Sequence, residues 1–222
     1  GVNPSTCGFN NGVAVLTITG GTIPYTYLWP TGQSASSVNN LAQGLYVVTV
    51  TDMNGCSLLL TVNIPNDAAP TVTTVKFDVE CNGQNTGWAT ATASGGKFPY
   101  TYQWNDPSNQ TTSTATFLYA GTYTVVVIDL NGCTASGPVV ITQQPPLTLI
   151  VTGDSLICFG QSSQISATGI GGFGLYGYTW SNGATTQTQI VSPTITTTYS
   201  VSITDANGCS SQNGGVITVN VS

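Results

Sequence analysis

Apolar and polar side chains alternate with period two along residues 44–52, GLYVVTVTD. This alternation predicts a half-buried antiparallel β-strand, with Tyr46, Val48 and Val50 on its inward face. The pattern recurs twice further along the chain. The equivalent inward-facing residues are Tyr123, Val125 and Val127, and then Tyr199, Val201 and Ile203. The sequence therefore predicts three copies of one central strand.

Each of these strands runs into the sequence Asp-x-Asn-Gly-Cys, at residues 52–56, 129–133 and 205–209. Asn-Gly favours a two-residue turn, because both central positions of that turn need a positive φ. A second apolar run follows each turn. We therefore expect a β-hairpin in which Asn-Gly forms the turn and the cysteine opens the return strand.

Two other segments of each copy also have strand patterns. Small or aliphatic residues occupy one face of the segment before each Gly-Gly pair, and these inward-facing sets are Ala14, Leu16 and Ile18, then Ala89, Ala91 and Ala93, then Ile165, Ala167 and Gly169. In the segment after each pair, a Tyr and a Trp two residues apart share one face. We predict that these Trp residues, Trp29, Trp104 and Trp180, are buried in the core.

The motifs recur at nearly fixed spacing. The Asp-x-Asn-Gly-Cys motifs are 77 and 76 residues apart, and the Gly-Gly motifs are 75 and 76 apart. This period indicates tandem repeats, at residues 1–66, 67–146 and 147–222. Short strands, Gly/Pro turns and a Trp in a middle strand predict an Ig-like sandwich for each repeat. The expected fold is all-β, with three tandem β-sandwich modules in an extended array.

The chain has six cysteines, two in each repeat, at separations of 49, 52 and 51 residues. An even number with one pair per repeat predicts disulfides and an oxidising compartment. The wide spacing, without His or Cys-x-x-Cys, argues against a metal site. The expected pairing is within repeats: Cys7–Cys56, Cys81–Cys133 and Cys158–Cys209. The alternative is pairing between repeats, as Cys56–Cys81 and Cys133–Cys158, which would leave Cys7 and Cys209 unpaired.

Charge and composition exclude several functions. Charged residues make up 5% of the chain and the net charge is −6, so there is no basic patch for nucleic acid or an anionic membrane. No apolar run approaches 18 residues, so membrane insertion is not expected. With no His and a single Glu, Glu80, we predict no enzyme, no catalytic residue and no cofactor. Asp52, Asp129 and Asp205 are expected to cap their own turns rather than to bind calcium, so no metal is predicted.

Trp88 differs from the other three tryptophans. Its position has the opposite parity to the small inward-facing residues around it, so its side chain should point outward. It is therefore a candidate for stacking on a sugar ring or for contact with a neighbouring repeat or chain. The alternative is a surface Trp covered by a local loop.

The combined motif is Gly-Gly-x-x-Pro-Tyr-x-Tyr-x-Trp followed by Leu-x-x-Gly-x-Tyr-x-Val-x-Val-x-Asp-x-Asn-Gly-Cys. It resembles the SprB-type repeat of Bacteroidetes gliding-motility and cell-surface adhesins. The first repeat carries it at residues 20–29 and 41–56, and the second at 95–104 and 118–133. The third repeat lacks the Pro-Tyr pair and the Leu-x-x-Gly-x-Tyr segment, and is closer to PKD-like and Ig-like modules.

The resemblance implies a structural or adhesive repeat segment of a large secreted protein on the bacterial cell surface. Such proteins leave the cell through the type IX secretion system and act as adhesin stalks or filaments, some of them in gliding motility. The implied partners are neighbouring repeats of the same chain, surface polysaccharide or other copies of the filament. Residues 154–156, Asp-Ser-Leu, resemble the O-glycosylation signal of Bacteroidetes, which makes Ser155 a candidate site. The alternative function is that of carbohydrate-binding accessory modules in a secreted enzyme.

Overall fold

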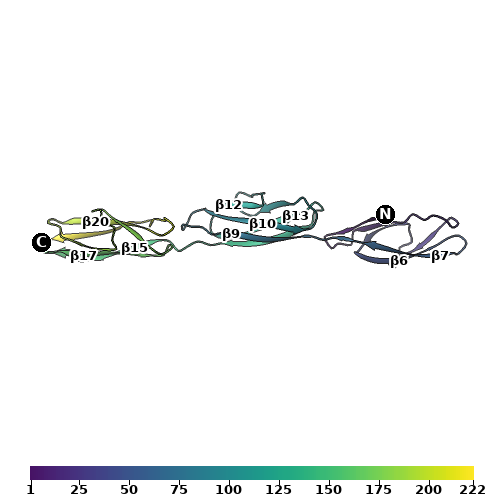
Figure 1. Cartoon of the computed structure of the whole chain (residues 1–222), viewed down its shortest axis with the longest axis horizontal. Coiled ribbons are helices and arrows are strands. Elements are labelled where there is room, and N and C mark those ends of the chain that lie inside the picture. The colour runs from purple at the N-terminus through teal and green to yellow at the C-terminus, as the bar shows by residue number, and fades with distance from the viewer. The chain divides into compact units, whose positions relative to one another are not determined.

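The computed structural model describes residues 1–222, which form strands and no helix (Figure 1). Nothing in the chain is a helix long and apolar enough to cross a membrane. The all-β prediction is therefore confirmed. The strands fall into three consecutive sets, each of which builds two main sheets.

The first set builds a sheet in the order β1-β3-β5 and a second in the order β4-β6-β7. Its strands are β1 (Val2–Asn3), β2 (Ser5–Thr6), β3 (Gly12–Val15), β4 (Thr26–Leu28), β5 (Ser37–Leu41), β6 (Gly44–Thr51) and β7 (Ser57–Ile64). The short strand β2 pairs in parallel with β8 (Asn66–Asp67). This is the strand order of an Ig-like sandwich, in which a sheet that contains Ig strands A, B and E faces a sheet of strands C, F and G. Here β1, β3 and β5 correspond to A, B and E, and β4, β6 and β7 correspond to C, F and G.

The second and third sets repeat this arrangement. The second has sheets β12-β10-β9 and β11-β13-β14, and the third has β15-β17-β19 and β16-β21-β20-β18. The strands of the second set are β9 (Pro70–Phe77), β10 (Gly87–Gly95), β11 (Thr101–Trp104), β12 (Thr114–Leu118), β13 (Gly121–Ile128) and β14 (Thr134–Ile141). Those of the third set are β15 (Thr148–Gly153), β16 (Leu156–Ile157), β17 (Ser163–Ile170), β18 (Gly177–Trp180), β19 (Thr188–Val191), β20 (Thr197–Thr204) and β21 (Gly215–Val221).

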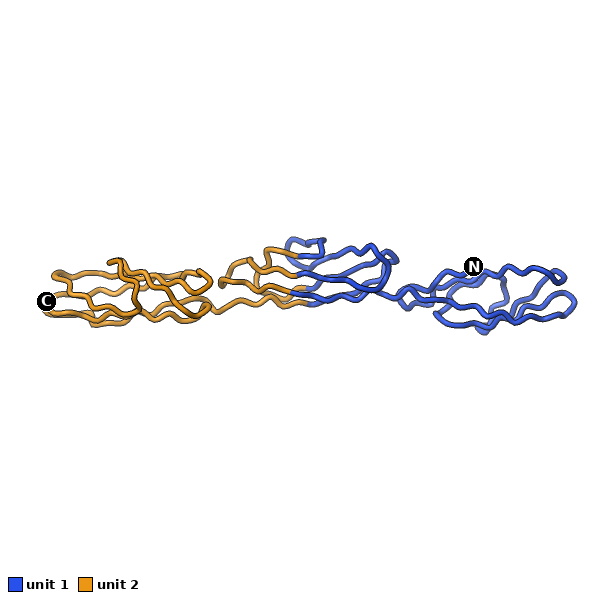
Figure 2. The backbone as a smooth tube through the Cα atoms, viewed as in Figure 1, with its two compact units in different colours: residues 1–75, 90–114, 124–138 blue, residues 76–89, 115–123, 139–222 orange.

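The chain also divides into two compact units, and this division crosses the second set of strands (Figure 2). Unit 1 comprises residues 1–75, 90–114 and 124–138, and unit 2 comprises residues 76–89, 115–123 and 139–222. Unit 1 contains the junction between the first and second sequence repeats, and unit 2 contains the junction between the second and third. The repeat boundaries at residues 66/67 and 146/147 stay a prediction.

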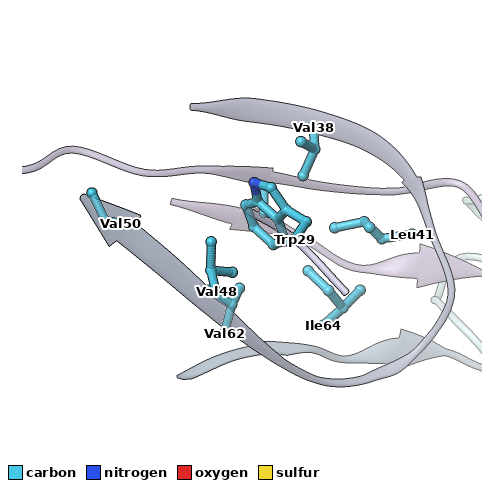
Figure 3. Close-up of a cluster of buried hydrophobic side chains, with 8 residues drawn as sticks. Trp29, Val38, Leu41, Val48, Val50, Val62 and Ile64 are labelled. Carbon is cyan, nitrogen blue, oxygen red and sulfur yellow. The ribbon is translucent and has the colours of Figure 1, made fainter. Parts of the chain in front are cut away.

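A tryptophan lies at the centre of each sandwich core. Trp29, Trp104 and Trp180 are 1–2% exposed, as predicted. In the first core Trp29 packs among aliphatic side chains of both sheets, which are Val38, Leu41, Val48, Val62 and Ile64 (Figure 3). Each indole N–H donates to a backbone carbonyl at 2.9–3.0 Å, so the one polar group of the ring is satisfied inside the core.

The inward faces predicted from the alternating pattern are also correct. Val48 and Val50 are buried on β6, and Tyr46 is half-buried beside them. The Tyr46 hydroxyl donates to the carbonyl of Ala42 at 3.0 Å, which is a tyrosine corner. The equivalent residues on β13 and β20 are buried, and they are Tyr123, Val125, Val127, Tyr199, Val201 and Ile203.

Candidate functional site

The Asp-x-Asn-Gly-Cys segment forms the same cage of hydrogen bonds in all three repeats. Oδ1 of Asp52 accepts the backbone N–H groups of Asn54 and Cys56 at 2.9 Å. Its Oδ2 accepts the N–H of Thr22, next to the Gly-Gly pair, at 3.0 Å. The matching bonds of Asp129 and Asp205 measure 2.8–3.0 Å. Each carboxylate thus caps its own turn and ties the hairpin to the Gly-Gly loop.

The turn itself differs from the two-residue type that the Asn-Gly pair predicts. Gly55 N–H donates to the carbonyl of Asp52 at 3.0 Å, and Asp52 N–H donates to the carbonyl of Cys56 at 3.0 Å. Only Gly55 has a positive φ, of 81°, while Asn54 does not. The loop therefore has three residues, 53–55, with glycine in the left-handed position. The two-residue prediction is wrong because the Asp carboxylate, which receives the Asn N–H, favours this wider turn.

The backbone donors around two of these carboxylates, Asp52 and Asp129, also lower their pKa. For Asp52, the N–H of Thr22 and then that of Cys56 stabilise the charged form and lower the pKa. For Asp129, burial opposes ionisation, but the N–H groups of Lys97, Cys133 and Asn131 outweigh it, so the pKa lies below its ordinary value of 3.8.

Acid should therefore destabilise the fold through these turns. A carboxylate with a lowered pKa in the folded state stabilises the protein above its unfolded pKa, and this contribution is lost as pH falls through the folded value. We expect the melting temperature, measured by circular dichroism, to decrease as the pH is lowered below about 4. This decrease should be less steep in Asp129→Asn. Asp154→Asn, which changes an exposed carboxylate, should keep the full acid sensitivity. Equal slopes in the two variants would contradict this role for Asp129.

The disulfides join cysteines of consecutive repeats. Cys7 is bonded to Cys133, with Cα atoms 5.3 Å apart, and Cys81 is bonded to Cys209, with Cα atoms 5.5 Å apart. Cys56 and Cys158 are free and exposed. The predicted pairing within repeats is therefore wrong, and so is the alternative of Cys56–Cys81 and Cys133–Cys158. In both bridges, the first cysteine of one repeat meets the turn cysteine of the next.

The reason is that the two cysteines of one repeat lie at opposite ends of it. Cys7 N–H donates to the carbonyl of Asp67 at 2.9 Å, beyond the end of β7, whereas Cys56 stands just before β7 begins. A strand of eight residues spans about 27 Å, far more than a disulfide can bridge. We call the Cys7 side the outgoing end of the repeat, and the Cys56 side the incoming end.

Contacts at each junction place the two ends together. In unit 1, the Asn131 side chain in the second hairpin donates to Asp67 at 3.1 Å, near Cys7. In unit 2, Gly172 N–H donates to the carbonyl of Pro145 at 3.0 Å. The turn cysteine of a repeat is therefore held next to the segment arriving from the preceding repeat. No group of three or more Cys, Asp and Glu residues is placed to hold a metal ion.

Trp88 lies on the surface, as its parity predicts. It is 37% exposed and stacks on Phe77, with ring centroids 5.9 Å apart and planes 5° apart. Trp88 lines an open hollow of about 390 Å³. Phe117, which is 77% exposed, lines the same hollow, together with Asn85 and Thr86. The structure thus gathers three exposed aromatic rings in one repeat, of which the sequence singled out only Trp88.

Ser155 lies just before β16 and is exposed. Its carbonyl accepts the backbone N–H and the side-chain amide of Asn220, both at 2.9 Å. The hydroxyl is thus on an exposed residue whose backbone is fixed to the last strand. Glycosylation of Ser155 stays a prediction.

The fold and its junctions define the chain as a series of Ig-like β-sandwich repeats with disulfides between consecutive repeats. The family model of the SprB repeat matches residues 2–34 and 73–109. These stretches carry the Gly-Gly motifs of the first and second repeats, so the predicted resemblance is confirmed there. No curated protein sequence matches the chain.

Similar solved structures include chains of tandem Ig domains. The chain is 14% identical to the N-terminal eight Ig domains of Down Syndrome Cell Adhesion Molecule isoform 1.30.30, with 99% of this chain and 35% of that chain covered and a TM-score of 0.46. It is 11% identical to the Ig1–Ig3 ectodomain of mouse nectin-like molecule 4, with 98% and 97% covered and a TM-score of 0.42. The chain spans about a third of the length of the first of these structures.

Proposed function

We propose that this chain is a structural and adhesive repeat segment of a large secreted bacterial cell-surface protein, an adhesin stalk or filament. The observation that carries the proposal is the pair of disulfides between consecutive repeats. At each junction the repeats are connected twice, by the linker and by a disulfide. Such a double connection limits bending and transmits tension between repeats, which is what a stalk requires.

The surface and the family support the same function. Only 5% of the residues are charged, and the chain has no His, so the fold presents neutral polar groups rather than a catalytic cluster. The match to the SprB repeat supports a cell-surface protein, and the disulfides support an oxidising, extracellular location. We further propose export through the type IX system and a contribution to gliding motility. The extended arrangement of the repeats stays a prediction.

Antibodies raised against residues 1–222 test this function on intact cells of the source bacterium. We expect them to label the cell surface, and we expect external protease to remove the label. Disruption of type IX export should abolish the surface label while the protein accumulates inside the cell. A cytoplasmic protein detected only after lysis is the control. A label that also needs lysis would contradict the proposal.

A second candidate function, carbohydrate binding, is favoured by the aromatic hollow around Trp88. An exposed, flat pair of stacked rings provides the apolar face on which a sugar ring packs. We expect Trp88→Ala to weaken binding to the surface polysaccharide of the same bacterium about tenfold, which is about 1.4 kcal/mol. Phe98→Ala removes a ring of 77% exposure outside the hollow and is the matched control. Unchanged polysaccharide binding in Trp88→Ala, measured by calorimetry, would remove this candidate.

A further inference from the structure

Cys56 and Cys158 are the two free cysteines of the chain, and both have bonded counterparts in the other repeats. Cys56 corresponds to the turn cysteines Cys133 and Cys209. In all three, the backbone N–H of the cysteine donates to Oδ1 of the turn Asp at 2.8–2.9 Å, and its carbonyl accepts the Asp N–H at 2.9–3.0 Å. The backbone of Cys56 is thus already held as in the two bonded cysteines.

Cys158 has the same local structure as the bonded Cys81. Each begins a four-residue turn that is closed by the N–H of a glutamine three residues later, Gln84 at 3.1 Å and Gln161 at 3.0 Å. The third residue of each turn is a glycine with a positive φ, of 77° and 84°. A parallel β-bridge also lies just before each cysteine. Val79, before Cys81, pairs with Gln143, which follows the last strand of the second set. Ile157, before Cys158, pairs with Val221 in the last strand of the third set. Cys158 therefore stands at an outgoing end, as Cys81 does.

A hollow beside Cys56 gives a second, independent observation. In the second repeat, the buried Pro70 of the incoming segment lies against Gly96, with its nitrogen 3.0 Å from where a Cβ would stand. In the third, the buried Leu147 lies against Gly172, at 3.3 Å by the same measure. In the first repeat the corresponding place is an open hollow of about 170 Å³. Its lining includes Ile18, Gly20, Gly21, Tyr25, Asp52 and Cys56.

We propose that Cys56 and Cys158 are bridging positions for a further repeat of the same kind. Cys56 forms a disulfide with the first cysteine of such a repeat, and the segment leading from that repeat fills the hollow. Cys158 forms a disulfide with the turn cysteine of such a repeat. Because a first cysteine pairs only with a turn cysteine in both observed bridges, the linkage has one polarity, with an outgoing end joined to an incoming end. This inference rests on the two bridges and not on the cell-surface function.

The bridge forms by thiol–disulfide exchange with a small disulfide such as oxidised glutathione. The Cys158 thiolate attacks one sulfur of oxidised glutathione and releases one glutathione thiolate. The turn cysteine of the further repeat then attacks the Cys158 sulfur of the mixed disulfide and releases the second glutathione as a thiolate. Two cysteine thiols are oxidised, and one glutathione disulfide is reduced to two thiols.

A tandem protein tests the proposal, with two full copies of the chain joined by a spacer that copies residues 145–151. This spacer supplies the equivalent of Leu147 for the second copy. Sixty-four residues follow Cys158 in the first copy, the spacer adds seven, and Cys56 is residue 56 of the second copy. Cys158 of the first copy and Cys56 of the second are then 127 residues apart in sequence, between the separations of 126 and 128 residues in the two observed bridges.

After refolding in a glutathione buffer, we expect the tandem protein to titrate two free thiols instead of four. Peptide mapping should find Cys158 of the first copy linked to Cys56 of the second. The control, with Cys56→Ser in the second copy only, should titrate three. Four free thiols in the tandem protein, with both original bridges of each copy intact, would overturn the proposal.

A mixture of separate chains then identifies the source of the further repeat. Cys56→Ser and Cys158→Ser chains are each expected to stay monomeric alone, because neither offers both kinds of cysteine. A mixed disulfide dimer shows that a second copy can supply the repeat. A bridge in the tandem protein without any mixed dimer places the further repeat in the same polypeptide. Abundant dimers of either variant alone would overturn the polarity of the proposal.

Discussion

Replacing Trp104 by alanine is expected to lower the free energy of unfolding by about 3–5 kcal/mol. The ring is 1% exposed at the centre of its sandwich, and its N–H donates to the carbonyl of Thr112 at 3.0 Å. The substitution removes the largest side chain of that core and leaves a cavity between the two sheets, because each sheet is fixed by its own strand pairing and relaxes only partly into the space. Denaturant unfolding followed by circular dichroism measures the loss.

Trp88→Ala is the matched control for this prediction, because it removes the same side chain from the same repeat. Trp88 is 37% exposed and contacts Phe77 on the surface, so we expect a loss of about 1 kcal/mol or less. If both variants lost the same stability, Trp104 would not be the core anchor that the structure indicates.

Removing one bridge, in the double variant Cys7→Ser with Cys133→Ser, is expected to lower stability by about 2–4 kcal/mol. The bridge closes a separation of 126 residues, so its loss frees a large part of the unfolded chain. Loss of the bridge also removes the covalent link between the second hairpin and the outgoing end of the first repeat. The melting temperature, measured by calorimetry, should fall accordingly.

The double variant Cys56→Ser with Cys158→Ser changes the same number of cysteines and leaves both bridges in place. We expect its free energy of unfolding to change by about 0.5 kcal/mol or less, as for ordinary surface substitutions. A fall as large as that of the bridge variant would mean that Cys56 and Cys158 are bonded in the folded monomer.

Local patterns are sufficient to predict the strands and the core. Period-two alternation determines which side chains face inward, so the sequence alone places Val48, Trp29 and Ala14 in the core, where all three are buried. The outward direction of Trp88 follows from the same parity. Its stacking on Phe77 does not, because that contact joins β9 to β10 across the sheet and depends on their register.

The disulfides cannot be predicted in the same way. Separations of 49 to 52 residues fit a pair within a repeat, but spacing contains no information on which end of a sandwich a cysteine occupies. The deciding features are the short parallel pairings, such as Ser5 with Asn66, that place each first cysteine at the outgoing end. Two-residue strands of this kind leave no periodic signal. The regular recurrence of two cysteines in each repeat is the only indication that the sequence offers.

Peptide mapping under non-reducing conditions tests the central claim, that disulfides join consecutive repeats. Pepsin is suited to it, because the chain has only two Lys or Arg residues for trypsin and because acid suppresses thiolate exchange during digestion. The structure predicts linked peptides that contain Cys7 with Cys133 and Cys81 with Cys209. Linked peptides that join Cys7 to Cys56, or Cys81 to Cys133, would contradict it.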